Sequence, residues 1–300
     1  MKCLVTGGAG FIGSNLVDAL LERGDEVVVV DNESADCHDH FYWNDRALNH
    51  KVDINDFKSL RPLFDGVDYV FHLAAEARIQ PSLINPLQAV QTNVLGTANV
   101  LQASREAGVR RVMYSSTSSA YGLKNTPPLS ENMPNDCLNP YSVSKTAGEE
   151  LCKLYTRLFK LETVTFRYFN VYGLRQPVKG QYAPVLGLFL RQRNTGQQLT
   201  VVGDGLQRRD FTDVRDVVQA NMLTAACQNP AIVGETINVG TGKNHSVLDV
   251  AALVGGETTH IPERLGEARI TLASTEKMER FLDWKPMRQL EDWVNEYGRL

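Results

Sequence analysis

The sequence predicts an α/β protein with a doubly wound parallel sheet and a second, smaller mixed α/β lobe. Two observations lead to this prediction. In roughly the first 170 residues, short apolar segments typical of buried strands alternate with segments of helical periodicity. A glycine-rich turn also follows the first of these strands. Such alternation produces βαβ units, whose parallel strands carry helices on both faces and bind ligands at the strands' carboxyl ends.

Each expected element follows from a local signal. Residues 11–23 have helical periodicity and end at Gly24, a residue type that commonly closes helices. Residues 26–31 form a β-branched run, as expected for a strand buried on both faces. The other expected strands are 2–6, 69–73, 111–115, 163–169 and 236–239, and the other expected helices are 87–107 and 141–159.

The expected helix at 87–107 has an apolar face, which we expect to pack on the sheet. That face contains Leu87, Val90, Val94, Thr97 and Leu101. After Asn170 the alternation loosens, with turns at Tyr172-Gly173 and Lys179-Gly180. We therefore expect residues 1–169 and about 211–240 to form the sheet domain, and about 170–210 with 241–300 to form the smaller lobe.

Composition excludes several classes of partner. A net charge of −4 gives no reason to expect nucleic acid or an anionic membrane, and no apolar run approaches the roughly 18 residues needed to span a bilayer. The N-terminus lacks the apolar region of a signal peptide. The five cysteines are odd in number and scattered, which is typical of a reduced, cytoplasmic protein. Residues 37–40, Cys-His-Asp-His, are expected to be a solvated loop and no metal is expected.

The turn Thr6-Gly7-Gly8-Ala9-Gly10-Phe11-Ile12-Gly13 lies between a strand and a helix. Its glycines let backbone N–H groups approach a diphosphate at a helix N-terminus, as in Rossmann folds. Asp31 ends the second strand, where a carboxylate accepts hydrogen bonds from a ribose and repels a 2′-phosphate. This favours NAD over NADP. Asp53 and Ile54 are either adenine contacts or part of a helix N-terminus.

Tyr141 and Lys145 are four residues apart at the start of an expected helix, so they project from one face. We expect Lys145 to lower the pKa of the Tyr141 phenol and make it available as a general base. The hydroxyl run from Ser115 to Ser119 follows a strand, at the end of the sheet where ligands bind.

With these three features in order, the chain resembles the extended short-chain dehydrogenase/reductase family, and within it the nucleotide-sugar 4-epimerases such as UDP-glucose 4-epimerase. The resemblance covers nearly the whole chain. It also includes residues 72–75 (HLAA), 93–97 (NVLGT), 167–173 (RYFNVYG), 203–205 (GDG), 209–211 (RDF), 238–242 (NVGTG) and 264–267 (RLGE).

The resemblance implies roles for individual residues. Thr117 would hydrogen bond the sugar 4-hydroxyl, Tyr141 would be the base, and Lys145 would hold the nicotinamide ribose. The substrate would be bound by Asn170, Arg209, Arg264 and Glu267, with Thr271 at the position that admits or excludes N-acetyl groups. The NAD site would contain Gly7, Gly10, Phe11, Ile12, Gly13, Asp31, Asn32, Asp53, Ile54, Leu73, Ala74, Ala75, Asn93, Ser115, Tyr141, Lys145 and Tyr168.

The implied reaction is inversion at C4 of UDP-glucose, UDP-galactose or the N-acetylated pair through a 4-keto sugar. Dehydrating and decarboxylating relatives carry acidic residues after the threonine, whereas Ser118 and Ser119 are not acidic. A single-direction keto-sugar reductase and a non-catalytic dinucleotide sensor remain as alternatives. The resemblance also implies a homodimer, formed through helices 87–107 and 141–159. Residues 37–43 receive no functional assignment.

Overall fold

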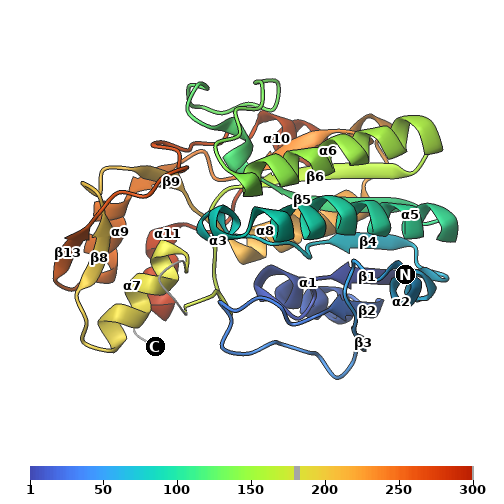
Figure 1. Cartoon of the computed structure of the whole chain (residues 1–300), viewed down its shortest axis with the longest axis horizontal. Coiled ribbons are helices and arrows are strands. Elements are labelled where there is room, and N and C mark those ends of the chain that lie inside the picture. The colour runs from blue at the N-terminus through green and yellow to red at the C-terminus, as the bar shows by residue number, and fades with distance from the viewer. Residues whose placement is uncertain (179–182, 299–300) are drawn as a thin grey trace.

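A seven-stranded, fully parallel sheet forms the larger part of the computed structural model, which describes residues 1–178 and 183–298 (Figure 1). The predicted turn at Lys179-Gly180 lies outside the described residues. In spatial order the strands are β11 (Thr236–Val239), β6 (Glu162–Tyr168), β5 (Arg111–Thr117), β4 (Tyr69–His72), β1 (Lys2–Thr6), β2 (Glu26–Asp31) and β3 (Leu48–Lys51). The strand order changes direction between β1 and β4, so the carboxyl ends of these strands form a ligand-binding crevice. The predicted α/β fold is confirmed.

Alternating side chains of the strands supply two hydrophobic clusters, one on each face of the sheet. In β2, Val27 and Val29 pack in one cluster, and Val28 and Val30 pack in the other. The first face is covered by α1 (Phe11–Glu22), α8 (Val214–Ala226) and α10 (Glu276–Leu282). The second is covered by α2 (Phe57–Leu60), α5 (Thr97–Ala107) and α6 (Pro140–Phe159).

The smaller lobe has its own hydrophobic cluster, at the other end of the molecule in Figure 1. It contains α7 (Val185–Asn194), β8 (Leu199–Val202), β9 (Arg208–Asp210), β12 (Asn244–Ser246), α9 (Val247–Val254), β13 (Thr258–Ile261) and α11 (Leu290–Tyr297). The packing departs from the expected division on both sides. Phe211, expected in the sheet domain, packs in the cluster of the smaller lobe. Met278 of α10 and Trp284 pack in the sheet cluster, because their side chains cover α8 and β11.

The remaining elements are short connections. They are η1 (Arg61–Phe64), α3 (Ile79–Ile84), α4 (Pro86–Val90), η2 (Gln91–Gly96), η3 (Ser118–Tyr121), β7 (Val171–Tyr172), β10 (Thr212–Asp213) and η4 (Pro230–Ile232). Within the described ranges, no helix combines the length and the hydropathy that a membrane crossing requires.

The predicted single helix at 87–107 is instead three segments, α4, the π-helical η2, and α5. The wider π turn changes the angular position of every residue that precedes it. Leu101 is therefore buried, while Leu87 and Val90 are 80% and 47% exposed. Within η2, Asn93 accepts a hydrogen bond from the Glu76 N–H (2.9 Å) and donates to the Ser144 hydroxyl of α6 (2.9 Å).

Helix α6 begins sharply and lies unusually close to the sheet. Asn139 and Ser142 form a capping box, and Pro140 occupies the first turn. Further along, a Cβ on Gly148 would lie 2.2 Å from the Tyr114 hydroxyl oxygen of β5. Only glycine permits this approach, which fixes the start of α6 beside the carboxyl end of β5.

A buried ion pair joins α6 to the centre of the sheet. Glu149 of α6 accepts hydrogen bonds from Arg167 Nε (2.9 Å) and Nη2 (2.7 Å) on β6, and from the Ser116 hydroxyl (2.5 Å) on β5. The Glu149 and Arg167 side chains are 0% and 4% exposed. A charge at such a position is stable only while its partner is present.

Replacing Glu149 with Gln should therefore destabilise the protein by about 3–5 kcal/mol, because it leaves the Arg167 guanidinium buried without a counter-charge. The free energy of unfolding in urea measures this loss. Glu150→Gln is the matched control, since Glu150 lies on the same helix but pairs with Lys153 at the surface. Equal stability of the two variants would contradict the prediction.

Candidate active site

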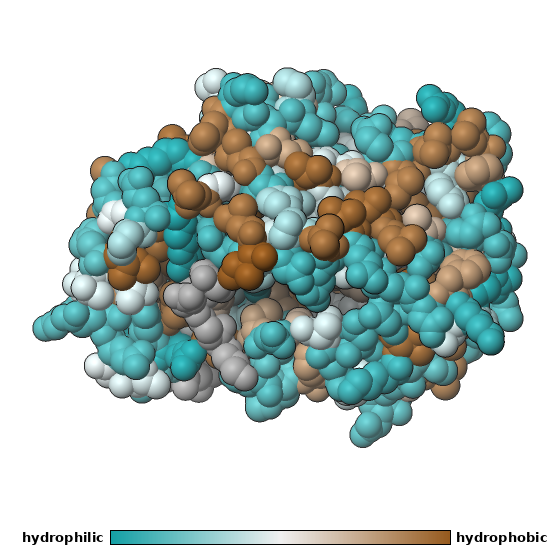
Figure 2. Space-filling view, viewed as in Figure 1, coloured by the Kyte–Doolittle hydropathy of each residue, from teal (hydrophilic) through white to brown (hydrophobic). Residues whose placement is uncertain are grey.

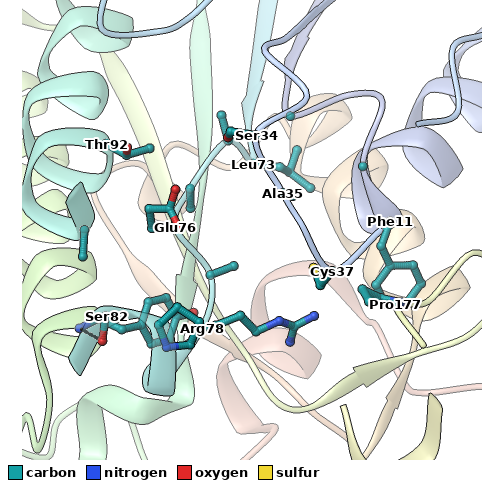
Figure 3. Close-up of a pocket in the computed structure, with 18 of the residues that line it drawn as sticks. Phe11, Ser34, Ala35, Cys37, Leu73, Glu76, Arg78, Ser82, Thr92 and Pro177 are labelled. Atoms are coloured by element: carbon teal, nitrogen blue, oxygen red, sulfur yellow. Dashed lines mark hydrogen bonds between the residues drawn. The ribbon is translucent and has the colours of Figure 1, made fainter. Parts of the chain in front are cut away.

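A cavity of about 790 Å³ opens at the carboxyl ends of the strands. Its walls come from the turn after β1, the segments after β2 and β4, the end of β5, the start of α6 and the segment after β6, together with Arg264 and Glu267 of the smaller lobe. Figure 3 shows that these walls bring residues distant in sequence, such as Phe11, Cys37, Arg78 and Pro177, around one space. The crevice predicted from strand order is therefore a real cavity.

The glycine turn forms one end of the cavity and has no room for side chains. A Cβ on Gly13 would lie 2.1 Å from the Gly7 carbonyl oxygen, so the first turn of α1 can approach the strand only with glycine there. Gly7, Gly10, Phe11, Ile12 and Gly13 all line the cavity, as predicted. The N-terminus of α1 thus points toward the cavity, as a diphosphate group requires.

Asp31 lies beside this turn at the end of β2. Its carboxylate accepts hydrogen bonds from the Ala9 N–H (3.1 Å) and the Glu33 N–H (2.8 Å). Burial raises the pKa of Asp31, and these backbone donors partly oppose the increase. The carboxylate therefore borders the cavity where a ribose hydroxyl can donate to it.

Only some of the residues predicted to contact the adenosine part of NAD line the cavity. Asn32 and Ile54 line it. Asp53 is not among the lining residues, because its carboxylate accepts hydrogen bonds from the Asn32 side chain (3.1 Å) and the Asn55 N–H (2.8 Å). Leu73, Ala74 and Ala75 line the cavity as predicted. Asn93 does not line the cavity, because its side chain forms hydrogen bonds with the Glu76 backbone and the Ser144 hydroxyl.

Thr117, Tyr141 and Lys145 all line the cavity at the junction of β5 and α6. Thr117 lies close enough to Tyr141 for its hydroxyl to lower the pKa of the phenol. Lys145 is buried, with its ammonium nitrogen 4.4 Å from the centroid of the Tyr114 ring. The three residues predicted to be catalytic are therefore gathered in one place.

Burial dominates the electrostatics of this trio in the free protein. Burial raises the pKa of Tyr141, whereas the nearby Thr117 hydroxyl and the positive charge of Arg78 lower it. Burial also lowers the pKa of Lys145 to about 7, despite the opposing influence of Cys152 and Glu149. The expected effect of Lys145 on Tyr141 in the NAD-bound site stays a prediction.

Tyr168 forms part of the cavity floor and is held from two sides. Ser115 donates a hydrogen bond to its hydroxyl (3.2 Å), and the Asn221 amide of α8 donates another (2.8 Å). Both Ser115 and Tyr168 line the cavity, as the resemblance implied. Their positions depend on contacts between β5, β6 and α8 that lie far apart in sequence.

The predicted substrate residues divide into two groups. Asn170, Arg264 and Glu267 line the cavity. Arg209 and Thr271 do not, because they are involved in contacts within the lobe. Arg209 donates to the Arg208 carbonyl (3.0 Å), and Thr271 accepts from the Asp210 N–H (3.4 Å) and is 6% exposed. In this conformation Thr271 does not border the sugar space.

Sequence reasoning missed four acidic or basic residues of the cavity, Asp36, His38, Glu76 and Arg78. Their signal was position, since each follows the carboxyl end of a parallel strand. Residues 37–40 were expected to be a solvated loop, yet Cys37 and His38 are half-buried and line the cavity. Among the described residues, no group of three or more His, Cys, Asp or Glu side chains is arranged to bind a metal ion.

Comparisons with known proteins agree with this geometry. The model of the NAD dependent epimerase/dehydratase family matches residues 3–240. The chain is 37% identical over 300 residues to a putative UDP-glucose 4-epimerase of Methanocaldococcus jannaschii, covering 97% of this chain and 95% of that protein. It is 39% identical over 261 residues to a UDP-N-acetyl-alpha-D-glucosaminuronate decarboxylase of Bacillus cytotoxicus, covering 83% of this chain and 78% of that protein.

A solved structure extends the agreement to three dimensions. The UDP-glucose 4-epimerase of Thermotoga maritima, crystallised with UDP-glucose, superposes with a TM-score of 0.93 at 33% identity, covering 100% of this chain and 98% of that chain. The glycine turn and Asp31 fit the family's cofactor, NAD, for the reasons given above. The chain therefore belongs to the NAD-dependent epimerase/dehydratase family.

Proposed function

We propose that this protein is an NAD-dependent 4-epimerase of a UDP-activated hexose. The observation that carries the proposal is the arrangement at the end of β5. Thr117 and Tyr141 line the cavity together, close enough for the threonine hydroxyl to lower the pKa of the phenol, whereas the neighbouring positions 118 and 119 carry serines that also line it. This site can remove and return a proton at one carbon, but it has no acid beside Thr117 for eliminating water.

NAD, when bound, supplies the hydride chemistry that such a reaction requires at C4 of the sugar. The residues of the chain manage the proton. Tyr141 accepts it from the 4-hydroxyl, directly or through Thr117, and later returns it. Burial raises the pKa of the phenol, whereas the Thr117 hydroxyl and the positive charge of Arg78 favour the phenolate.

A UDP-hexose as substrate is supported by the relatives. The Thermotoga maritima enzyme, which has nearly the same length and fold, was crystallised with UDP-glucose. Arg264 and Glu267 line the lobe side of the cavity, where they can bind the nucleotide part of such a substrate. The N-acetylated pair belongs to the proposal only as a possible second substrate, since Thr271 does not border the cavity.

One relative, 39% identical to this chain, is a decarboxylase. Oxidation of the sugar followed by loss of its carboxylate is therefore the second candidate function. The serines at 118 and 119 favour epimerisation, because family members that decarboxylate carry a glutamate in this stretch. A single-direction reductase is a further alternative, and it requires NAD to exchange freely.

The five free thiols are consistent with the proposed cytoplasmic location.

The reaction is tested by incubating the purified protein with UDP-glucose, UDP-N-acetylglucosamine and UDP-glucuronate without added NAD. The expected products are the galacto isomers of one or both of the first two, because epimerisation consumes no net reductant. Chromatography with mass detection identifies them. Release of carbon dioxide and a UDP-pentose from UDP-glucuronate would establish decarboxylation instead. Turnover only with added NAD, in which the sugar is oxidised and NADH accumulates, would establish a single-direction oxidoreductase.

Tyr141→Phe should lower kcat by about 10²–10⁴-fold, because it removes the hydroxyl that transfers the proton and keeps the ring. Binding of UDP should change little. Tyr155→Phe is the control, since Tyr155 lies on the same helix but donates its hydroxyl to Gln102 on α5. Near-normal turnover by the Tyr141 variant would rule out this residue as the base.

We also propose that the protein is a homodimer that associates through α4, η2 and α6. Large apolar side chains are exposed there, including Leu87 (80%), Val90 (47%), Leu95 (51%) and Val143 (52%). Figure 2 shows brown patches across the face on which Figure 1 places α3, α5 and α6. Contiguous apolar surface of this kind is typical of a protein interface.

Leu87→Glu should weaken the dimer by at least about tenfold, because a charge in an apolar interface loses its hydration without gaining a partner. Light scattering across a concentration series measures the dissociation constant. Leu206→Glu is the control, because Leu206 is 56% exposed and lies in the smaller lobe. A wild-type protein that stays monomeric at high concentration would contradict the proposal.

A further inference from the structure

The segment that follows β2, residues 33–43, contributes to the cavity wall and has no assigned role. It is anchored at both ends. Glu33 pairs with Lys51 of β3 and accepts a hydrogen bond from Trp43 Nε1 (2.8 Å). Tyr42 N–H donates to the Ala9 carbonyl of the glycine turn (2.8 Å). The segment is therefore tied across the turn and does not project freely into solvent.

These anchors bring His38 over the start of α1. Its Nε2 atom lies 3.7 Å from the position that a Cβ on Gly10 would occupy. The ring also contacts Phe41, with 5.7 Å between ring centroids, and both residues line the main cavity. His38 thus faces the backbone N–H groups of the first turn of α1.

Arg78 approaches the same space from the opposite wall. Figure 3 shows its side chain extending across the cavity, away from Ser82 and toward Cys37 and Pro177. Its Nε atom is buried and has no hydrogen-bond partner among the described residues. A buried guanidinium N–H without an acceptor costs free energy unless a ligand provides one.

Burial lowers the pKa of His38, the charge of Arg78 lowers it further, and Asp39 partly opposes the decrease. Tyr42 and Arg175 border a smaller cavity on the other side of His38. Two groups that can both be cationic therefore line one cavity near the N-terminus of α1. An anion bound between His38 and Arg78 would remove their mutual repulsion and accept hydrogen bonds from the N–H groups of both side chains.

We propose that His38 and Arg78 close over the diphosphate of the dinucleotide cofactor from opposite sides, and that residues 33–43 are the strap that holds His38 in this position. The glycine turn binds the diphosphate from below through backbone N–H groups, and the two side chains bind it from above. This assignment rests on the family's cofactor and not on the proposed sugar, so either can fail alone.

The arrangement predicts uptake of a proton when NAD binds near neutral pH. His38 is largely neutral in the free protein, and the bound diphosphate raises its pKa. The additional affinity for NAD that His38 provides is therefore present at low pH, and it is lost as the pH rises through the pKa that His38 has in the NAD-bound protein. Lys145, whose pKa is about 7, also titrates in this range. Its contribution to the pH dependence of NAD binding is the same in the wild type and in the variants of His38 and Arg78, because all of them retain it.

The test is calorimetric titration of nucleotide-free protein with NAD at pH 6 and pH 8. The increase in the pKa of His38 on binding predicts that the wild type binds NAD about three- to tenfold more tightly at pH 6 than His38→Gln does, with similar affinities at pH 8. Arg78→Gln should weaken binding roughly tenfold at both pH values, and Arg78→Lys should restore part of it. Titration at pH 7 in buffers of different ionisation enthalpy counts the protons taken up, and this count should fall in the His38 variant.

His40→Gln is the matched control, because His40 lies on the same segment but is exposed and does not line the main cavity. It should leave both the affinity and the proton count unchanged. Thermal unfolding without ligand verifies that each variant is folded. The proposal is overturned if His38→Gln keeps the full pH dependence of the wild type. It is also overturned if Arg78→Gln weakens binding of UDP while leaving NAD unaffected, since Arg78 would then belong to the substrate site.

Discussion

The geometry of the site depends on one buried carboxylate, Glu149 of α6. Its hydrogen bonds with Ser116 and Arg167 connect α6 to two adjacent strands beneath the cavity. Ser116 precedes Thr117, Arg167 precedes Tyr168, and Glu149 follows Lys145 by one helical turn. The same interaction that secures the interior therefore sets the relative positions of the side chains above it. Gly148 reinforces this by allowing α6 to contact Tyr114 directly.

Burial has a second consequence, because it controls the charges in the cavity. It raises the pKa of Asp31 and Tyr141 and lowers that of Lys145 and His38, so in the free protein each of these groups is shifted toward its neutral form. A negatively charged diphosphate and a positively charged nicotinamide alter this balance in opposite senses at the two ends of the site. The protonation states of these groups therefore differ between the free protein and the protein during turnover. For this reason, a lysine four residues from a tyrosine does not by itself identify the tyrosine as a general base.

Much of the fold and of the cofactor end could be predicted from the sequence, because their signals are local. The Val27–Val30 run, the glycine turn and the helix-closing Gly24 each report a backbone conformation within a few residues. Predictions that depended on one continuous helix failed at 87–107. The π turn at η2 is stabilised by Asn93 contacting Glu76 and Ser144, and such a contact between distant segments leaves no periodicity in the sequence.

The sequence by itself determined the parallel sheet, the position of its ligand crevice and the side chains at the strand ends, because strand alternation and glycine spacing are sufficient for these. Tertiary structure decided which of those side chains border the cavity. It excluded Asp53, Asn93, Arg209 and Thr271, whose polar groups bind neighbouring protein atoms, and it included His38 and Arg78. Whether a polar side chain faces a ligand or another part of the protein depends on hydrogen-bond partners far away in the chain, and these become neighbours only when the chain folds.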